Sequence, residues 1–342
     1  MRCIAAMRKM EEGGVTVRSE VLRESGLAAA TPANRAEIER LRADLFRETL
    51  LETCQRVALG TVWSLMPKRI GNLFPLAKLW LAELADPKPG LPALGASPGP
   101  GEFAGIAREI SPSILLAAYA RGLYPKAHFG PLKWMSPEER CVLFFDEYHM
   151  PKRLRRLMRQ GRYAVTFDRA FERVIKACAG KREGRWHVTW ITPRIMRAYA
   201  DLFDVGHAHS FEVWNENGEL AGGGYGVSIG GVFFTESQFS HEPNTSKLGF
   251  SVLNWHLAKW GYVMNDGKRP TPTILDMGFR VIPRETFLLR LVAGEVLAGK
   301  PGRWEVEAGA KSVADWQPGK NAAAANSVEA AKPPSGEPLR AA

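Results

Sequence analysis

One run, SFEVWNENGELAGGGYGVSIGGVFFTESQF at residues 210–239, constrains the fold more than any other part of the chain. Its aromatic and β-branched residues are typical of strands, and Asn-Gly and Gly-Gly pairs interrupt them where tight hairpin turns are expected. The run therefore predicts a three-stranded antiparallel meander. We expect strands at 211–214, 220–227 and 232–237, with turns at Asn217-Gly218 and Gly230-Gly231.

Helices and further strands are predicted on both sides of this meander. A long helix at 246–260 follows it, and helical and strand patterns alternate before it. This mixed order favours an antiparallel sheet with helices on its faces. The other expected helices cover 111–121, 151–160, 171–179, 193–205 and 284–292, and the other strands cover 141–145, 164–167 and 262–265.

The two ends of the chain differ in composition from this middle part. Helical spacing predicts helices at 36–59 and 74–84, and ADPKPGLPALGASPGPGEF then reads as a linker that ends near residue 105. Residues 301–342 are poor in large apolar side chains, so we predict a disordered tail. No signal peptide is evident, and the apolar stretch 57–66 is too short to span a bilayer.

Charge and cysteine content narrow the class of protein. The formal net charge is +10 and the pI is about 9.5, which favours an anionic partner, although a mildly basic surface without a ligand explains the same numbers. The four cysteines are far apart and form no CxxC pair, so we expect neither a zinc ribbon nor a disulfide framework. Reduced cysteines fit a cytoplasmic protein.

A basic helix is the first candidate binding element. The segment PKRLRRLMRQGR crowds cations onto a short helix, where they repel one another unless an anion neutralises them. We predict contact with nucleic acid, and the alternative is a solvated helix face. The cations are Lys152, Arg153, Arg155, Arg156, Arg159 and Arg162.

Two acids and two histidines are candidates for chemistry. Glu236 and Asp266 end predicted strands in apolar surroundings, where they could position and deprotonate an amine. His207 and His209 share one face of a strand, but no nearby acid or cysteine completes a metal site, so core hydrogen bonding is expected. The glycines of GGGYG either let a ligand approach the backbone or form a bulged strand.

Six motifs in this order resemble the leucyl/phenylalanyl-tRNA–protein transferases. The likeness extends over about residues 106–295, and several of the motifs are long. They are YARGLYP (119–125), WMSPEER (134–140), TWIT (189–192), GHAHSFEVW (206–214), GGGYGVSIGGVFFTESQFS (222–240) and SK (246–247).

The resemblance implies a fold, a reaction and partners. Members of the family move Leu or Phe from aminoacyl-tRNA to the N-terminal Arg or Lys of a protein, which marks that protein for degradation. We therefore expect an α+β protein with an acetyltransferase-like (GNAT-like) mixed sheet at 166–300, preceded by a small α/β domain at 106–165 and a helical extension at 1–105. We expect a monomer without a metal or cofactor.

The resemblance also implies roles for individual residues. Asp266 matches the catalytic aspartate, Glu236 matches a glutamate at the aminoacyl pocket, and Trp134 and Trp190 match tryptophans around the terminal adenosine and the aminoacyl group. Stacking on such rings contributes about 1–3 kcal/mol per base. The basic helix would contact the acceptor stem. Phe234, Gln238 and Ser240 are further expected substrate contacts.

Two departures from the family pattern leave alternatives open. Gln238 stands where the family has an apolar methionine, so the transferred residue could be Leu, Phe or Met. Lys268 stands where the family has glutamine; it either pairs with Asp266 and blunts activity or points to solvent. The competing functions are an acyltransferase with another donor and a non-catalytic relative that binds tRNA or N-terminal peptides.

Overall fold

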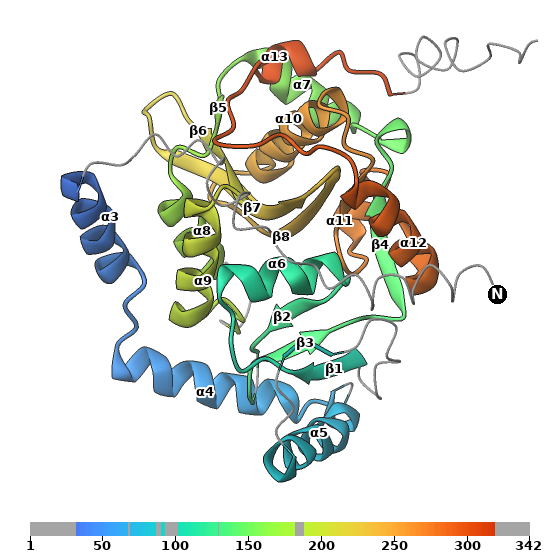
Figure 1. Cartoon of the computed structure of the whole chain (residues 1–342). Helices are drawn as coiled ribbons and strands as arrows, with labels where there is room; N and C mark the ends of the chain where they lie inside the picture. The colour runs from blue at the N-terminus through green and yellow to red at the C-terminus, as the bar shows by residue number, and fades with distance from the viewer. Residues whose placement is uncertain are drawn as a thin grey trace, which may run out of the picture.

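A computed structural model describes residues 32–67, 69–86, 90–92, 102–128, 130–181 and 188–318 (Figure 1). Residues 1–31, most of the expected Pro/Gly linker, and the tail from 319 lie outside the described residues. Within the described part, an α+β core carries two sheets. Their strand orders are β1-β3-β2 and β10-β4-β9-β8-β7-β6-β5.

The predicted meander forms the centre of the larger sheet. Its strands are β6 (Ala208–Trp214), β7 (Leu220–Ile229) and β8 (Val232–Ser240), paired antiparallel as expected. Beside β8 lies β9 (Met264–Asp266), and this pair is parallel because helix α10 (Thr245–Lys259) crosses over between them. The sheet is therefore mixed. Strands β4 (Glu139–Leu143), β5 (Ala164–Phe167) and β10 (Arg280–Pro283) complete it.

The glycines of β7 serve packing within the protein. A Cβ at Gly226 would lie 2.3 Å from the Phe234 carbonyl oxygen and 2.5 Å from the Phe233 ring. The pairing of β7 with β8 also shifts register between Tyr225 and Gly226. Of the two expectations for this segment, the bulged strand is confirmed, and it is the neighbouring aromatic rings that approach the backbone closely.

Helices cover both faces of the larger sheet. Helices α6 (Pro112–Ala120), α8 (Phe171–Ala179) and α9 (Pro193–Asp204) contact one face, and α10 covers the other (Figure 1). The basic helix α7 (Lys152–Gln160) packs on α10 through Leu154 and Met158. Helix α12 (Arg284–Glu295) lies at the β10 end, and α11 (Pro272–Leu275) follows β9.

The helical extension docks on the core. The helix expected at 36–59 is two helices, α3 (Pro32–Leu45) and α4 (Leu50–Ser64), because Thr49 caps the second one in a capping box with Glu52. Arg42 of α3 is buried and bonds Glu172 and Asp204 on α8 and α9. A second docking helix, α5 (Leu73–Ala85), contacts β1.

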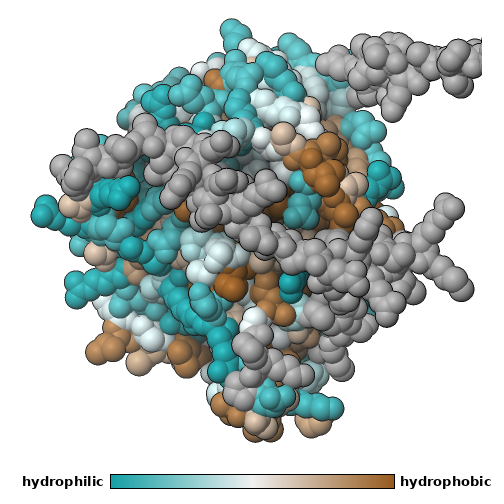
Figure 2. Space-filling model, viewed as in Figure 1, coloured by the Kyte–Doolittle hydropathy of each residue, from teal (hydrophilic) through white to brown (hydrophobic). Residues whose placement is uncertain are grey.

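The smaller sheet begins inside the expected linker. Strand β1 (Phe103–Ile106) pairs with β3 (Lys133–Met135), which pairs with β2 (Tyr124–Lys126). Large apolar side chains of α4 and α5 remain exposed, and Figure 2 shows hydrophobic atoms at the lower edge, where these helices lie. Examples are Leu50, Leu51, Phe74, Trp80 and Leu81.

The prediction of disorder from residue 301 is wrong for 301–318. Trp304 is 1% exposed and stacks on His209 with 3.7 Å between the ring centroids. Val313 of α13 (Ala310–Val313) is buried, and Trp316 stacks on Tyr148. A few large apolar side chains thus attach this segment to the core although its average composition is that of a disordered chain.

Candidate active site

A large cavity lies between β8, the segment after β9 and the stretch before α9. Its volume is about 860 Å³, and its walls include Trp190, Glu236 and Gln238. A smaller cavity of about 170 Å³ adjoins it and adds Lys268. The two share Lys126, Trp190, Glu236 and Arg269. Four predicted site residues, Lys268 among them, therefore border these two adjoining cavities.

Asp266 is held in a fully buried ion pair with Arg140. Arg140 Nε donates a hydrogen bond to Asp266 Oδ1 over 3.2 Å, and Arg140 Nη2 donates one to Asp266 Oδ2. Arg140 also donates to the Gly122 carbonyl over 2.6 Å and lies 4.1 Å from the Phe287 ring centroid. Because the Asp266 side chain is 0% exposed and both oxygens are bonded, it does not face the cavity in this structure.

Lys268 does not pair with Asp266 through its side chain, and it does not point to solvent. Its Nζ donates to the Thr235 carbonyl over 2.6 Å and pairs with Glu236 Oε1 at 2.7 Å. Its backbone N–H donates to Asp266 Oδ1 over 2.8 Å. The strand ends at Asp266 and Lys268 has φ +65°, so the rule that i and i+2 share a face fails here.

Glu236 is the centre of a second polar network. Its Oε1 also accepts a hydrogen bond from the Tyr119 hydroxyl, which in turn contacts the Tyr199 hydroxyl. Burial first, then the charge of Glu236, raises the pKa of Tyr119 well above its usual range, so the phenol remains a donor. Glu236 Oε2 is buried and has no hydrogen-bond partner among the described residues.

The predicted substrate contacts separate into two groups. Trp190 and Gln238 line the main cavity, and the Ser240 hydroxyl bonds the Ser246 hydroxyl over 2.7 Å at the start of α10. Trp134 is 1% exposed and Phe234 is 0% exposed, so both rings are core residues here. Neither ring lines the main cavity in this structure, so direct contact of these two residues with substrate stays a prediction.

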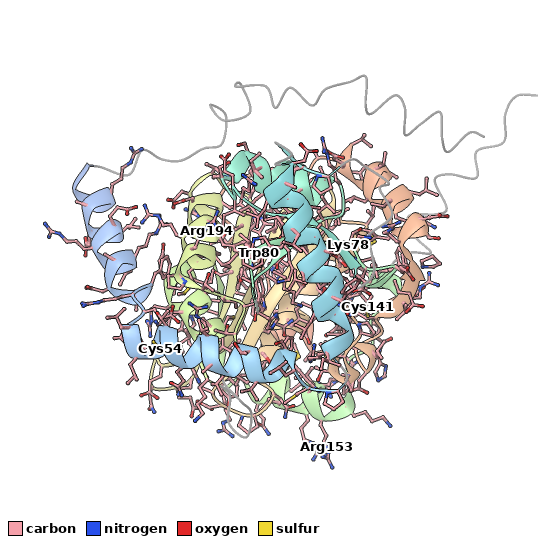
Figure 3. The ribbon with its side chains drawn as sticks, turned by 90° about the horizontal axis from the view of Figure 1, so that it is seen from below. Cys54, Lys78, Trp80, Cys141, Arg153 and Arg194 are labelled. Carbon is pink, nitrogen blue, oxygen red and sulfur yellow. The ribbon has the colours of Figure 1, made fainter. Side chains whose placement is uncertain are left out.

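The basic helix presents most of its cations to solvent, as Arg153 does in Figure 3. Arg155 is half-buried and donates over 2.8 Å to the Ala314 carbonyl, and Arg159 bonds Asp315 over 2.6 Å. Two of the six cations therefore hold the C-terminal segment. The exposed cations Lys152, Arg153, Arg156 and Arg162 have no ion pair with a described acid.

The histidines serve the core. His209 Nδ1 lies 2.8 Å from Asp168 Oδ2, and His207 lies beside the Ser228 carbonyl. Among the described residues, no group of three or more His, Cys, Asp or Glu comes together around a possible metal site. In the same part of the chain, no helix has both the length and the apolar character that crossing a membrane requires.

Sequence reasoning missed Arg140, Tyr119 and Tyr199. Tyr119 opens the motif YARGLYP and Arg140 ends WMSPEER, so their places in long motifs were an available signal. Their function depends on contacts with residues that are 117 and 126 positions away along the chain. No local pattern encodes such pairs.

Comparisons with known proteins agree on one family. Its sequence profile, described as "Leucyl/phenylalanyl-tRNA protein transferase", matches residues 142–292. The protein of that name from Azotobacter vinelandii is 45% identical over 189 residues, 55% of this chain and 83% of the relative. The one from Anaeromyxobacter sp. is 42% identical over 61% of this chain and 89% of the relative.

Solved structures are more distant. The crystal structure of FemX has a TM-score of 0.34 and 12% sequence identity, and the match covers 44% of this chain and 61% of that chain. A likeness of this size assigns neither fold nor function.

Proposed function

The chain belongs to the leucyl/phenylalanyl-tRNA–protein transferase family, and from that premise we propose how its cavity transfers an amino acid from aminoacyl-tRNA to a protein. The donor residue would be Leu, Phe or Met, and the acceptor would be an N-terminal Arg or Lys. The observation that carries the proposal is Lys268, bound to Glu236 at the cavity wall. We further propose that the larger sheet is GNAT-like and that 106–165 forms a small domain before it.

The reaction needs little acid–base assistance. The α-amine of the acceptor attacks the ester carbonyl carbon, the C–O bond breaks, and the tRNA 3′ oxygen leaves with a proton while the amine loses one. An α-amino group has a pKa of about 7.7–8.0, so roughly a tenth is neutral at pH 7. Orientation of two bound reactants can contribute about 7–11 kcal/mol. Positioning is therefore the main task of the cavity.

Lys268 is suited to stabilise the oxyanion that forms on the ester carbonyl. An ammonium group has three N–H donors, and two of those of Lys268 are used by Thr235 and Glu236. The third is available to a carbonyl oxygen in the cavity. Glu236 balances the lysine charge, so a cationic acceptor N-terminus meets a neutral pair rather than a bare cation.

Asp266 positions Lys268 through the backbone of that lysine. Its carboxylate accepts the backbone N–H of Lys268, and Arg140 fixes the carboxylate in turn. In this proposal Asp266 is a positioning residue, and its contact with substrate is not required. Tyr119 is likewise a positioning residue for Glu236, because its hydroxyl donates a hydrogen bond to that carboxylate.

Binding of the tRNA would extend beyond the cavity. Trp190 lines the cavity and would stack on the terminal adenosine, and the exposed cations of α7 would contact phosphates of the acceptor stem. Gln238 would contact the side chain of the donor amino acid.

The test is a transfer assay with the full chain. Bulk tRNA charged with all amino acids is incubated with peptides that differ at their N-terminus, and mass spectrometry identifies the added residue. Leu, Phe or Met on Arg or Lys peptides supports the proposal. A different added residue or a different acceptor peptide would mean that the enzyme has another specificity. Transfer from a non-tRNA acyl donor favours the other acyltransferase, and tRNA binding without product favours the non-catalytic relative.

A further inference from the structure

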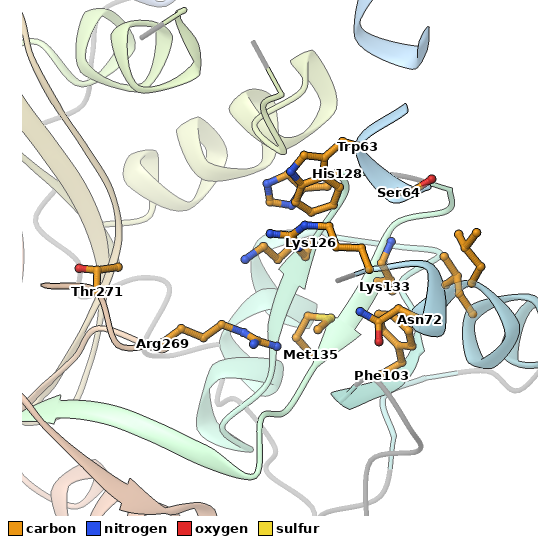
Figure 4. A pocket seen from close by; sticks show the side chains of 13 residues that line it. Trp63, Ser64, Asn72, Phe103, Lys126, His128, Lys133, Met135, Arg269 and Thr271 are labelled. Atoms are coloured by element: carbon orange, nitrogen blue, oxygen red, sulfur yellow. The ribbon is translucent and has the colours of Figure 1, made fainter. Parts of the chain in front are cut away.

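A second large cavity opens where the helical extension meets the small sheet. Its volume is about 590 Å³, and Figure 4 shows side chains from both parts around it. Helices α4 and α5 and the turn between them contribute Trp63, Arg69 and Leu76. We call it the extension cavity. It shares Lys126, His128, Arg269 and Thr271 with the main cavity, so the two spaces adjoin.

The charged side chains in the described lining of the extension cavity are all cations. Arg69, Lys126, Lys133 and Arg269 line it, and no acid does. Arg269 pairs with Glu102 outside the lining, whereas Arg69 and Lys126 have no ion pair with a described acid. Cations gathered in a partly buried space repel one another unless an anion enters it.

The titration of these groups agrees with the geometry. Burial first, then the charge of Lys268, lowers the pKa of Lys126 to about 8. Burial and Lys126 lower the pKa of Lys133 to about 8. Burial and the neighbouring cations lower the pKa of His128 to about 3, so its ring stays neutral. A bound anion would oppose each of the charge effects.

An aromatic stack holds Arg69 at this cavity. The Trp63 ring lies on His128 with 5.0 Å between centroids and 14° between planes, and the Arg69 guanidinium lies 3.6 Å from the Trp63 centroid. A Cβ at Gly60 would lie 2.9 Å from the His128 carbonyl oxygen, so α4 touches this loop. The guanidinium is therefore oriented before any ligand arrives.

We propose that the extension cavity binds the sugar–phosphate backbone at the 3′ end of the tRNA, with Arg69, Lys126 and Lys133 as its phosphate ligands. The inference rests on the proposed function, because that function places the aminoacyl end in the adjoining cavity. Trp63 and Arg69 lie outside the stretch that matches the family profile, residues 142–292. The extension is thus a part of this chain's tRNA site.

Two probes separate this subsite from the main cavity. The trinucleotide CCA with a 5′-phosphate carries the backbone, and puromycin carries an adenosine joined to an amino acid but no phosphate. Binding of each to the full chain is measured over a series of salt concentrations. For the trinucleotide, Arg69→Gln is expected to reduce the slope of log K against log salt by about 0.7, the value of one lost contact to a single strand. Puromycin binding should not change.

Matched variants keep the test specific. Lys78→Gln removes an exposed cation of α5 that does not line the cavity (Figure 3), and it should leave both probes unaffected. Trp63→Leu should weaken the trinucleotide as Arg69→Gln does, and Arg69→Lys should restore most of the slope. Thermal melting of each variant confirms that it is folded.

The outcomes distinguish two failures. An unchanged trinucleotide slope in Arg69→Gln, with puromycin still bound, overturns this inference and leaves the proposed function intact. Inorganic phosphate that displaces the trinucleotide at equal concentration also overturns it, since the site would then recognise a free anion. Wild-type protein that binds neither probe overturns the donor assignment of the proposed function itself.

Discussion

Two acid–base pairs lie side by side at the end of β9, and they differ in what surrounds them. In the pair of Arg140 and Asp266, the side chains are 1% and 0% exposed and both carboxylate oxygens are bonded. In the pair of Lys268 and Glu236, the side chains are 10% and 0% exposed, the lysine borders the cavity, and Glu236 Oε2 has no hydrogen-bond partner among the described residues. In the first pair, both carboxylate oxygens already have hydrogen-bond partners. In the second pair, one carboxylate oxygen of Glu236 can still accept a hydrogen bond.

This difference teaches where chemistry can occur. A buried charge whose partners are complete is costly to disturb and has nothing left to offer a substrate. A pair with an unused donor and acceptor beside a cavity can bind one. We therefore expect changes in the first pair to reduce mainly stability and changes in the second to reduce mainly catalysis.

The largest expected effect is that of Asp266→Asn on stability. The change leaves Arg140 buried without a counter-charge, which should lower the free energy of unfolding by about 3–5 kcal/mol. Urea denaturation measures it, with the exposed Asp276→Asn as control. A variant that loses transfer activity but keeps its stability would break the comparison and return Asp266 to direct catalysis.

Next in size is the effect of Lys268→Met on turnover. Loss of one oxyanion donor should lower kcat by about 10²–10³-fold, or about 2.7–4 kcal/mol. Lys268→Gln restores an N–H donor and the residue of the family pattern, so it should retain far more activity. Exposed Lys311→Met is the control. Higher activity in both Lys268 variants would mean that the lysine blunts the enzyme.

An effect of intermediate size is expected for Tyr119→Phe, which tests the pair of Lys268 and Glu236. It removes a hydrogen bond to the Glu236 carboxylate, which should cost about 1.5–3 kcal/mol, visible in kcat as well as in unfolding. The buried Tyr148→Phe is matched to it: its hydroxyl bonds Ser251 over 2.6 Å on the other face of the sheet. That control should lose stability only. Equal loss of kcat in both would contradict a specific role for Tyr119.

The smallest expected effect concerns donor choice. Gln238→Met makes the wall next to Glu236 more apolar and should shift kcat/KM toward Leu-tRNA or Phe-tRNA by about tenfold, or about 1.4 kcal/mol. Competition between charged tRNAs measures the shift, and Gln317→Met, an exposed residue, is the control. An unchanged preference would show that Gln238 does not contact the donor side chain.

The sequence by itself determined the order and type of the elements in the core. The Asn-Gly and Gly-Gly pairs at the expected turns predicted the meander of β6, β7 and β8. Helical spacing predicted the bounds of α7, α8, α9 and α10 to within a few residues. These signals are local, because they depend on turn chemistry and on the period of apolar residues. The long motifs likewise sufficed to identify the family.

Only the tertiary structure decided which polar groups meet. Arg140 and Asp266 lie 126 positions apart. The side chain of Lys268 pairs with Glu236 rather than Asp266 because the strand ends at Asp266, two residues before Lys268, so the alternation of a strand does not reach it. Packing also attached residues 301–318 through Trp304 and placed Trp63 at a cavity. Such contacts join residues that are far apart along the chain, so no local pattern in the sequence records which side chains meet.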